Sequence, residues 1–143
     1  MPELKGECLC GKIKFDISGP IGTIVNCHCS MCRKWHGAAF RTRTLVRASD
    51  FRWLSGGGLL SRYDSSPKVT KTFCKSCGSN LVSYYKDALD VIGIPLGGIE
   101  GDVGKHPELH IFAVDKAAWH EPSEDIPQHE QLPDETSFLR KIE

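Results

Sequence analysis

The sequence has no excess of charge of either sign and no long hydrophobic run. Lysine plus arginine and aspartate plus glutamate each number 18 in 143 residues, so the formal net charge is zero. A neutral balance gives no electrostatic reason to expect nucleic-acid or membrane-surface binding, although it is compatible with a local basic patch. The most apolar run, VIGIPLGGI at 91–99, is far shorter than the roughly 20 residues of a membrane-spanning helix. We therefore predict neither a nucleic-acid nor a membrane partner.

The first residues also lack a targeting pattern. MPELKGECLCG has no apolar core of the kind that a secretory signal needs, which predicts a cytoplasmic location. The chain is long enough for one domain with its own hydrophobic core. From Glu121 onward the sequence is acidic, interrupted by proline and poor in apolar anchors. We expect one domain over residues 1–120 and a tail over 121–143 that lies on the body or is partly disordered.

Helical patterns are scarce, and short alternating stretches dominate. In KIKFDIS at 12–18, the apolar residues Ile13, Phe15 and Ile17 alternate with polar ones, as in a half-buried strand. Further strands are expected at 22–27, 39–46, 58–64, 69–74, 80–85, 89–94 and 109–114. One short helix is expected at 30–37, ending at Gly37, and another at 134–143, capped by Asp134. The sequence predicts a mainly β fold.

Seven cysteines stand out against this background. An odd number leaves one thiol unpaired in an all-disulfide scheme, and a cytoplasmic setting disfavours disulfides, so metal binding or thiol chemistry is the better expectation. Buried thiols or disulfides without metal stay open as the alternative. The cysteines fall into three local groups: Cys8 and Cys10; Cys27, Cys29 and Cys32; and Cys74 and Cys77.

Two of these groups have the spacing of paired ligands. CKSCG at 74–78 has the form of a zinc knuckle, because two thiolates across a two-residue gap can bind one ion and Gly78 permits the tight backbone. If the CLCG segment is extended, its two thiols share one face while Leu9 faces the other way. Joining both pairs predicts a closed, structural zinc site made by Cys8, Cys10, Cys74 and Cys77.

The remaining group predicts a second zinc site of a different kind. On an extended segment Cys27 and Cys29 share a face, and Cys32 follows in a turn that can fold back. Three thiolates leave the fourth position open to an exchangeable ligand, which is the pattern of a catalytic zinc. A thiolate-rich site acidifies bound water weakly and suits a soft fourth ligand, such as the thiolate of a substrate.

His36 provides the main alternative at this second site. It lies four residues after Cys32, so in a helix the two side chains face the same side, and His36 could close the site as a purely structural one. A partition in which the cysteine groups exchange members is a further alternative. Arg33 and Lys34 could offset the anionic site or hold a substrate carboxylate. Arg33, Lys34 and His36 are therefore the candidates for catalytic or substrate-contacting residues.

Other histidines and the tryptophans have less specific interpretations. His28 is expected to be a hydrogen-bonding group at the surface or in a pocket rather than a metal ligand. Trp35, Trp53 and Trp119 are expected to be packing residues, one of which can form the wall of a pocket.

Four stretches together resemble a known family: GECLCGKIKF, CHCSMCRKWHGAAF, FCKSCGSNL and LHIFAVDKAAWHE. The chain resembles, from about Gly6 to about Glu121, the glutathione-dependent formaldehyde-activating enzymes, the group that includes centromere protein V. This resemblance implies a mainly β, zinc-containing β-tent fold of antiparallel sheets with few short helices, and two Zn²⁺ ions per chain. It implies a structural zinc on Cys8, Cys10, Cys74 and Cys77 and a catalytic zinc on Cys27, Cys29 and Cys32. The activity that it implies is that of a carbon–sulfur lyase making S-hydroxymethylglutathione from formaldehyde and glutathione.

The residues and the resemblance together predict a zinc-dependent carbon–sulfur lyase-like enzyme. Its expected partners are a small thiol such as glutathione and a small carbonyl such as formaldehyde. Two alternatives stay open: a noncatalytic zinc-stabilised module that binds a protein, and a redox sensor that uses the three-cysteine group as a switch. The fourth ligand at the second site separates the enzyme from the module, and zinc release under mild peroxide identifies the sensor.

Overall fold

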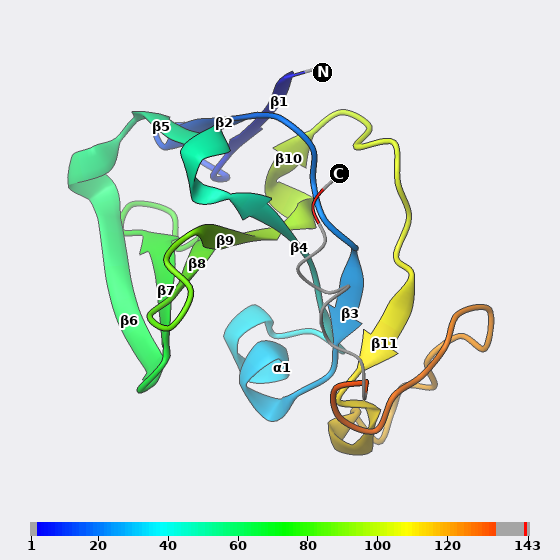
Figure 1. Cartoon of the computed structure of the whole chain (residues 1–143). Helices are drawn as coiled ribbons and strands as arrows, with labels where there is room; N and C mark the ends of the chain where they lie inside the picture. Colours follow the sequence, from blue (N-terminus) through cyan, green and yellow to red (C-terminus); the bar gives the residue numbers. More distant parts are fainter. Residues whose placement is uncertain (1–2, 134–141, 143) are drawn as a thin grey trace.

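Two β-sheets make up most of the computed structural model, which describes residues 3–133 and 142 (Figure 1). The strands are β1 Glu3–Glu7, β2 Lys14–Ser18, β3 Val25–Cys27, β4 Arg41–Arg47, β5 Phe51–Ser55, β6 Leu60–Ser66, β7 Val69–Cys74, β8 Asn80–Tyr85, β9 Val91–Pro95, β10 Ile99–Glu100 and β11 Leu109–Ile111. The α-helix α1 spans Ser30–His36, and short 3-10 turns occur at Ala48–Asp50, Gly57–Leu59, Leu96–Gly98 and Ala113–Asp115. The mainly β prediction is confirmed.

The two sheets differ in size and order. The smaller sheet has the order β10-β1-β2-β5, and the larger has the order β11-β3-β4-β9-β8-β7-β6. Each paired set of strands is antiparallel except β11 with β3, which run parallel. The chain moves from the first sheet into the second after β2 and returns for β5 and β10 (Figure 1).

The strand predictions agree best where alternation is regular. The expected strands at 69–74 and 80–85 are confirmed to the residue, whereas the expected strand at 109–114 ends at Ile111. The strands β1, β5 and β10 were not predicted. In β1 the sequence ELKGE has a single large apolar residue, and Gly6 provides the space into which the Phe15 ring of β2 packs. When a strand packs a glycine against the side chain of a neighbouring strand, it contributes no apolar side chain at that position, so its sequence has no alternating apolar pattern.

The hydrophobic core lies between the two sheets. Phe15 is 2 % exposed and packs against Phe51, with ring centroids 5.3 Å apart, and against Trp53 at 6.0 Å. The larger sheet contributes buried aliphatic side chains such as Val46 and Ile94 to the same cluster. The predicted packing role of Trp53 is thus confirmed, but that of Trp119 is wrong, because Trp119 is 75 % exposed.

The larger sheet uses its two faces differently. In β4, Thr44 and Val46 are buried on the core side, so Arg41 and Leu45 belong to the opposite face by strand alternation. The helix α1 lies against this second face: Asn80 of β8 donates a hydrogen bond to the carbonyl of Trp35 over 3.1 Å. The Trp35 ring also contacts Phe73 of β7 edge-on. This side of the sheet therefore forms a second, more polar interior.

The helix begins and ends as its sequence indicates. Gly37 has φ 61°, in the left-handed region, and its amide donates to the carbonyl of Arg33. The expected helix at 134–143, with Asp134 as its cap, lies outside the described residues apart from Ile142, which forms an antiparallel bridge with Gly22. No helix within residues 3–133 has the length and hydrophobicity needed to span a bilayer.

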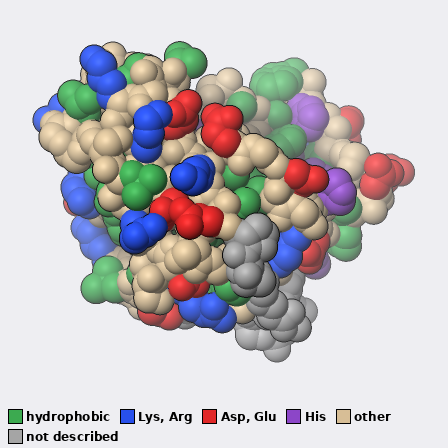
Figure 2. Space-filling model, turned by 90° about the horizontal axis from the view of Figure 1, so that it is seen from above, with side chains coloured by type: hydrophobic (Ala, Val, Ile, Leu, Met, Phe, Trp, Pro, Cys, Tyr) green, Lys and Arg blue, Asp and Glu red, His purple; other side chains and the backbone are tan. Residues whose placement is uncertain are grey.

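The segment after Glu121 lies against the edge of the larger sheet. The amide of His110 donates to Pro127 O over 2.8 Å, and the amide of His129 donates to His110 O over 3.0 Å. Gln128 thereby forms a parallel bridge with His110. The proposed boundary at residue 120 stays a prediction. Figure 2 shows that basic and acidic side chains are interspersed on the face seen there, as the zero net charge leads one to expect.

Candidate metal centres and pocket

Four cysteine side chains from two distant segments meet in one cluster, which we call the quartet: Cys8, Cys10, Cys74 and Cys77. Their sulfurs all lie within 4.8 Å of one another. The Sγ atoms of Cys8 and Cys10 are 3.5 Å apart, and those of Cys10 and Cys74 are 3.9 Å apart. A tetrahedral zinc site with Zn–S bonds of about 2.3 Å places its sulfurs about 3.8 Å from one another. The donor atoms and their spacing therefore fit Zn²⁺.

Both halves of the quartet are built on tight turns. The amide of Gly78, whose φ is 76°, donates to Cys74 O over 2.8 Å, as expected for a knuckle. The extended conformation expected for the other half is wrong: the amide of Gly11, whose φ is 77°, donates to Cys8 O over 3.0 Å and closes a turn. Leu9 faces away as expected, because it is 87 % exposed. Glycine after the second cysteine has the same backbone role in both halves.

Hydrogen bonds join the two turns and favour thiolates. The amide of Leu9 donates to the hydroxyl of Ser79 over 2.8 Å. Ser79 Oγ also lies 3.2 Å from the Sγ of Cys77, and hydrogen bonding from Ser79 lowers the pKa of the Cys77 thiol to about 5. A lowered pKa favours the deprotonated sulfur that a metal ligand must supply.

The other three cysteines, which we call the trio, also come together. Cys27 ends β3, Cys29 precedes α1, and Cys32 lies in the first turn of the helix. Their sulfurs lie within 4.8 Å of one another, and among residues 3–133 and 142 no additional histidine, cysteine or carboxylate ligand joins them. The Cys32 amide donates to the Sγ of Cys29 over 3.3 Å. This arrangement offers three soft donors, and it fits a thiophilic ion with one further coordination position.

The three sulfurs share charge unequally. Hydrogen bonds from the Cys27 and Cys32 thiols lower the pKa of Cys29, and the same interactions raise the pKa of Cys27. Without a metal, the first negative charge in the trio therefore resides on Cys29. A divalent ion would be needed to make all three thiolates stable together.

His36 does not join the trio. Its Nδ1 lies 3.2 Å from the side-chain nitrogen of Asn80, so Nδ1 accepts and Nε2 carries the proton. That Nε2 atom is buried and has no hydrogen-bond partner within the described chain. Burial, together with the charges of Arg41 and Lys71, lowers the pKa of His36 to about 4, so it is neutral at pH 7. The alternative in which His36 closes the second site finds no support in this geometry.

The predicted basic candidates point elsewhere, and two others take their place. Arg33 Nε donates to the carbonyl of Asp115 over 3.0 Å and so fixes α1 to the segment after β11, while Lys34 is exposed. Arg41 and Lys71 are instead each only 5 % exposed, and both act electrostatically on Cys32. Sequence reasoning missed them because each occupies an ordinary polar position in an alternating strand.

His28 agrees with expectation in part. It makes a hydrogen bond, with its Nε2 2.9 Å from Nδ1 of His110, and it belongs to neither cysteine cluster, but it is fully buried rather than at the surface. The rings of Phe40 and His120 pack beside it, at centroid distances of 4.9 and 6.2 Å. The side of β3 opposite the trio is thus filled by a layer of rings, which fixes the backbone between Cys27 and Cys29.

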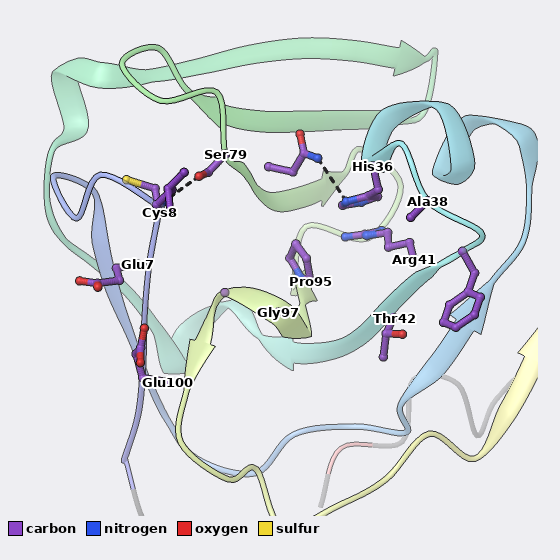
Figure 3. A pocket seen from close by; sticks show the side chains of 14 residues that line it. Glu7, Cys8, His36, Ala38, Arg41, Thr42, Ser79, Pro95, Gly97 and Glu100 are labelled. Atoms are coloured by element: carbon purple, nitrogen blue, oxygen red, sulfur yellow. Dashed lines mark hydrogen bonds between the residues drawn. The ribbon is translucent and has the colours of Figure 1, made fainter.

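A cavity of about 630 Å³ lies between the quartet and the basic face of the sheet (Figure 3). Cys8 and Ser79 line one side, and His36 and Arg41 point into it from the other (Figure 3). Glu7 lies at its margin but is paired with Lys14. The volume is in the range of small-molecule sites. A smaller cavity of about 460 Å³ lies beside Trp35, which is the tryptophan that forms a pocket wall.

Comparison with known proteins identifies the family. The family model described as "Glutathione-dependent formaldehyde-activating enzyme" matches residues 3–115. The chain belongs to this family. The matched region contains all seven cysteines, and the resemblance drawn from the cysteine motifs is confirmed.

Two relatives of this chain differ in their sequence identity to it and in the share of the chain that they match. An "Uncharacterized lyase" of Schizosaccharomyces pombe is 31% identical over 85 residues, which is 59% of this chain and 60% of that protein. The chain thus matches less than two thirds of the yeast protein's length. A Halomonas elongata protein named "Putative glutathione-dependent formaldehyde-activating enzyme" is 28% identical over 123 residues, covering 81% of this chain and 78% of that one.

A solved structure supports the fold of this family member. The crystal structure of a Rhodobacter sphaeroides protein, a structural genomics target, superposes with a TM-score of 0.60 at 24% sequence identity. The match covers 72% of this chain and 97% of that chain. This likeness concerns the fold alone.

Proposed function

We propose that this member of the formaldehyde-activating family is a zinc-dependent carbon–sulfur lyase. Its substrates in this proposal are a glutathione-like thiol and a small carbonyl such as formaldehyde. One observation carries the proposal: the trio offers three sulfurs and no fourth ligand among the described residues. Arg41, which pairs in register with Cys27, lines the neighbouring cavity of about 630 Å³, whose lining includes Cys8 but no sulfur of the trio. Family membership and the names of the two relatives agree with it.

The proposal assigns different roles to the two cysteine clusters. The structural zinc is held by Cys8, Cys10, Cys74 and Cys77, and the catalytic zinc by Cys27, Cys29 and Cys32. When bound to the trio, Zn²⁺ supplies a Lewis acid with an exchangeable coordination position for a soft donor. Both sites need reduced thiols, which is why a cytoplasmic location belongs to the proposal.

His36 is the proposed hydrogen-bond donor to the carbonyl oxygen. In the reaction the sulfur of the thiol bonds to the carbonyl carbon, the thiol releases its proton to solvent, and the carbonyl oxygen takes up one proton from solvent to become a hydroxyl. His36 is neutral at pH 7 and its Nε2–H lacks a partner within the described residues, so it can give a hydrogen bond to an oxygen in the cavity while keeping its own proton. The nearby Arg41 guanidinium stabilises negative charge as it develops on that oxygen.

The remaining predicted parts are included in the same proposal. Residues 1–120 form the catalytic unit, with 121–143 as an appended segment. Lys34 and Arg33 stay candidates for contacts with a larger substrate, although Arg33 is already bonded to the Asp115 carbonyl.

The test compares exchange rates, because the adduct also forms without an enzyme. Glutathione and formaldehyde are equilibrated, and the rate of exchange between glutathione and its hydroxymethyl adduct is measured by NMR with and without zinc-loaded protein. We expect acceleration by the wild type and none by Cys29→Ser, with Lys68→Met as an unaffected surface control. A wild-type protein that holds two zinc ions per chain and leaves the rate at its protein-free value would refute the proposal and favour the noncatalytic module.

A further inference from the structure

Two buried cations lie on the sheet face beneath α1. Arg41 of β4 and Lys71 of β7 are each 5 % exposed. Arg41 pairs in register with Cys27 of the trio, and its Nη2 donates to the hydroxyl of Ser83 over 3.2 Å. Lys71 pairs in register with that same Ser83, so the two cationic side chains belong to one face of the sheet.

Neither cation has a carboxylate partner among the described residues. The ion pairs among residues 3–133 involve other lysines and arginines, and none includes Arg41 or Lys71. The Nε of Arg41 is buried and has no hydrogen-bond partner in the part of the chain that the structure describes. Removing two unpaired charges from water costs free energy, so such an arrangement calls for a nearby anion.

The trio is the source of negative charge that these cations face. Cys32 and Cys29 both interact electrostatically with Lys71, and Cys32 also interacts electrostatically with Arg41. His36 contributes no charge at pH 7, because burial and the two cations hold its pKa at about 4. Arg43 on the same strand is half-buried, and its Nη1 is buried without a hydrogen-bond partner among the described residues, so it adds positive charge to this face. The relevant charges are therefore at least two cations and three thiolates.

A count of these charges indicates which kind of fourth ligand is favoured. Three thiolates and one divalent ion carry a net charge of minus one, which leaves at least one cation uncompensated. A neutral fourth donor, such as water or an alcohol, leaves that excess of positive charge in place, whereas an anionic donor reduces it. An anionic fourth ligand is therefore favoured over a neutral one.

We propose that Arg41 and Lys71 form a cationic floor that makes the trio bind its exchangeable ligand as an anion, and so selects a thiol, bound as thiolate, over a neutral oxygen donor. This inference rests on the proposed placement of zinc at the trio. It concerns selection of the ligand rather than the bond-forming step. On binding, the thiol sulfur keeps its electron pair and its proton passes to the buffer.

The test uses the full chain loaded with zinc and a small probe without carboxylates. Binding of 2-mercaptoethanol, and of ethylene glycol as its oxygen analogue, is measured by calorimetry in buffers of different ionisation enthalpy. We expect the wild type to bind the thiol with release of about one proton per site and to bind the glycol much more weakly. Arg41→Gln and Lys71→Met should each weaken thiol binding by at least about tenfold, with zinc content unchanged.

Surface variants provide the controls. Arg47→Gln removes an exposed arginine from the same strand as Arg41, and Lys68→Met removes an exposed lysine just before β7. Both should bind the thiol as the wild type does. Thiol affinities of Arg41→Gln and Lys71→Met that equal the wild-type value, at two zinc ions per chain, overturn the inference.

A stability measurement separates this role from a structural one. In metal-free protein at pH 7 the floor has no adequate counter-charge, so Lys71→Met should raise the melting temperature even as it weakens thiol binding in the zinc form. A lower melting temperature in the metal-free variant overturns the inference. If thiol binding behaves as expected but no formaldehyde adduct chemistry occurs, the inference stands and the proposed reaction fails. If the wild type binds no thiol, both fail.

Discussion

Replacing Cys74 with serine should cost far more stability than replacing Cys29 with serine, although each change removes one sulfur. A metal stabilises the native state only to the extent that it binds the unfolded chain less well. The quartet joins residues 64 positions apart, from Cys10 to Cys74, so an unfolded chain must close a long loop to assemble it. That closure costs about 4 kcal/mol, by the same relation that describes cross-linked loops.

At the trio, folding removes a much smaller loop-closure cost of zinc binding. Cys27 and Cys32 lie within six residues, and closing so short a loop in the unfolded chain costs about 2 kcal/mol. The unfolded chain can therefore compete for that ion. We expect the loss of zinc-dependent stability to be about 2 kcal/mol greater for Cys74→Ser than for Cys29→Ser.

Urea unfolding measures this difference. Each protein is unfolded with saturating zinc and again after chelation, so that the difference between the two curves removes the cost of placing a serine in a buried site. Zinc content should fall by about one ion per chain in both variants, and Cys29→Ser should keep its fold. Equal zinc-dependent losses in the two variants would show that both clusters are structural, and would refute the division of roles.

Two further changes test the fold itself. Arg52 holds the pKa of the Asp16 carboxyl, which is 2 % exposed, below its ordinary value of 3.8. A depressed pKa stabilises the fold above the unfolded value and loses that effect as pH falls. The stability advantage of the wild type over Asp16→Asn in chemical denaturation should therefore be full at pH 6 and shrink below about pH 4, and an advantage independent of pH would contradict this. Gly6→Ala should cost about 1–3 kcal/mol, because its Cβ would overlap the Phe15 ring, which Phe51 and Trp53 hold in place. Gly57→Ala, where the Cβ meets open space, is the matched control, and equal stability of the two variants in the same assay would show that Phe15 can move.

The grouping of the cysteines could be predicted because it follows from their local spacing. Pairs separated by one or two residues and followed by glycine indicated which sulfurs converge, even where the predicted backbone conformation was wrong. The CLCG segment was expected to be extended, yet Gly11 in the left-handed region turns it. The comparison with CKSCG, whose Gly78 has nearly the same φ, was the available cue.

The polar interior beneath α1 could not be predicted, because it depends on a tertiary contact. A strand was expected at 39–46, and alternation along β4 puts Thr44 and Val46 on one face and Arg41 on the other. Whether that other face is solvent-exposed or buried depends on where α1 crosses the sheet, and the sequence of the strand itself does not specify the position of the helix. The same holds for His28, whose burial depends on rings from residues 40, 110 and 120.

The chain that runs beside β11 has a consequence for handling this protein. β11 is the last strand of its sheet, and without residues 127–131 its amides and carbonyls would be open to any other extended chain. Unpaired edges of this kind promote association between molecules. A fragment cut at residue 120 would retain every cysteine but would expose an unpaired edge strand. We therefore expect it to self-associate even when both cysteine clusters are intact.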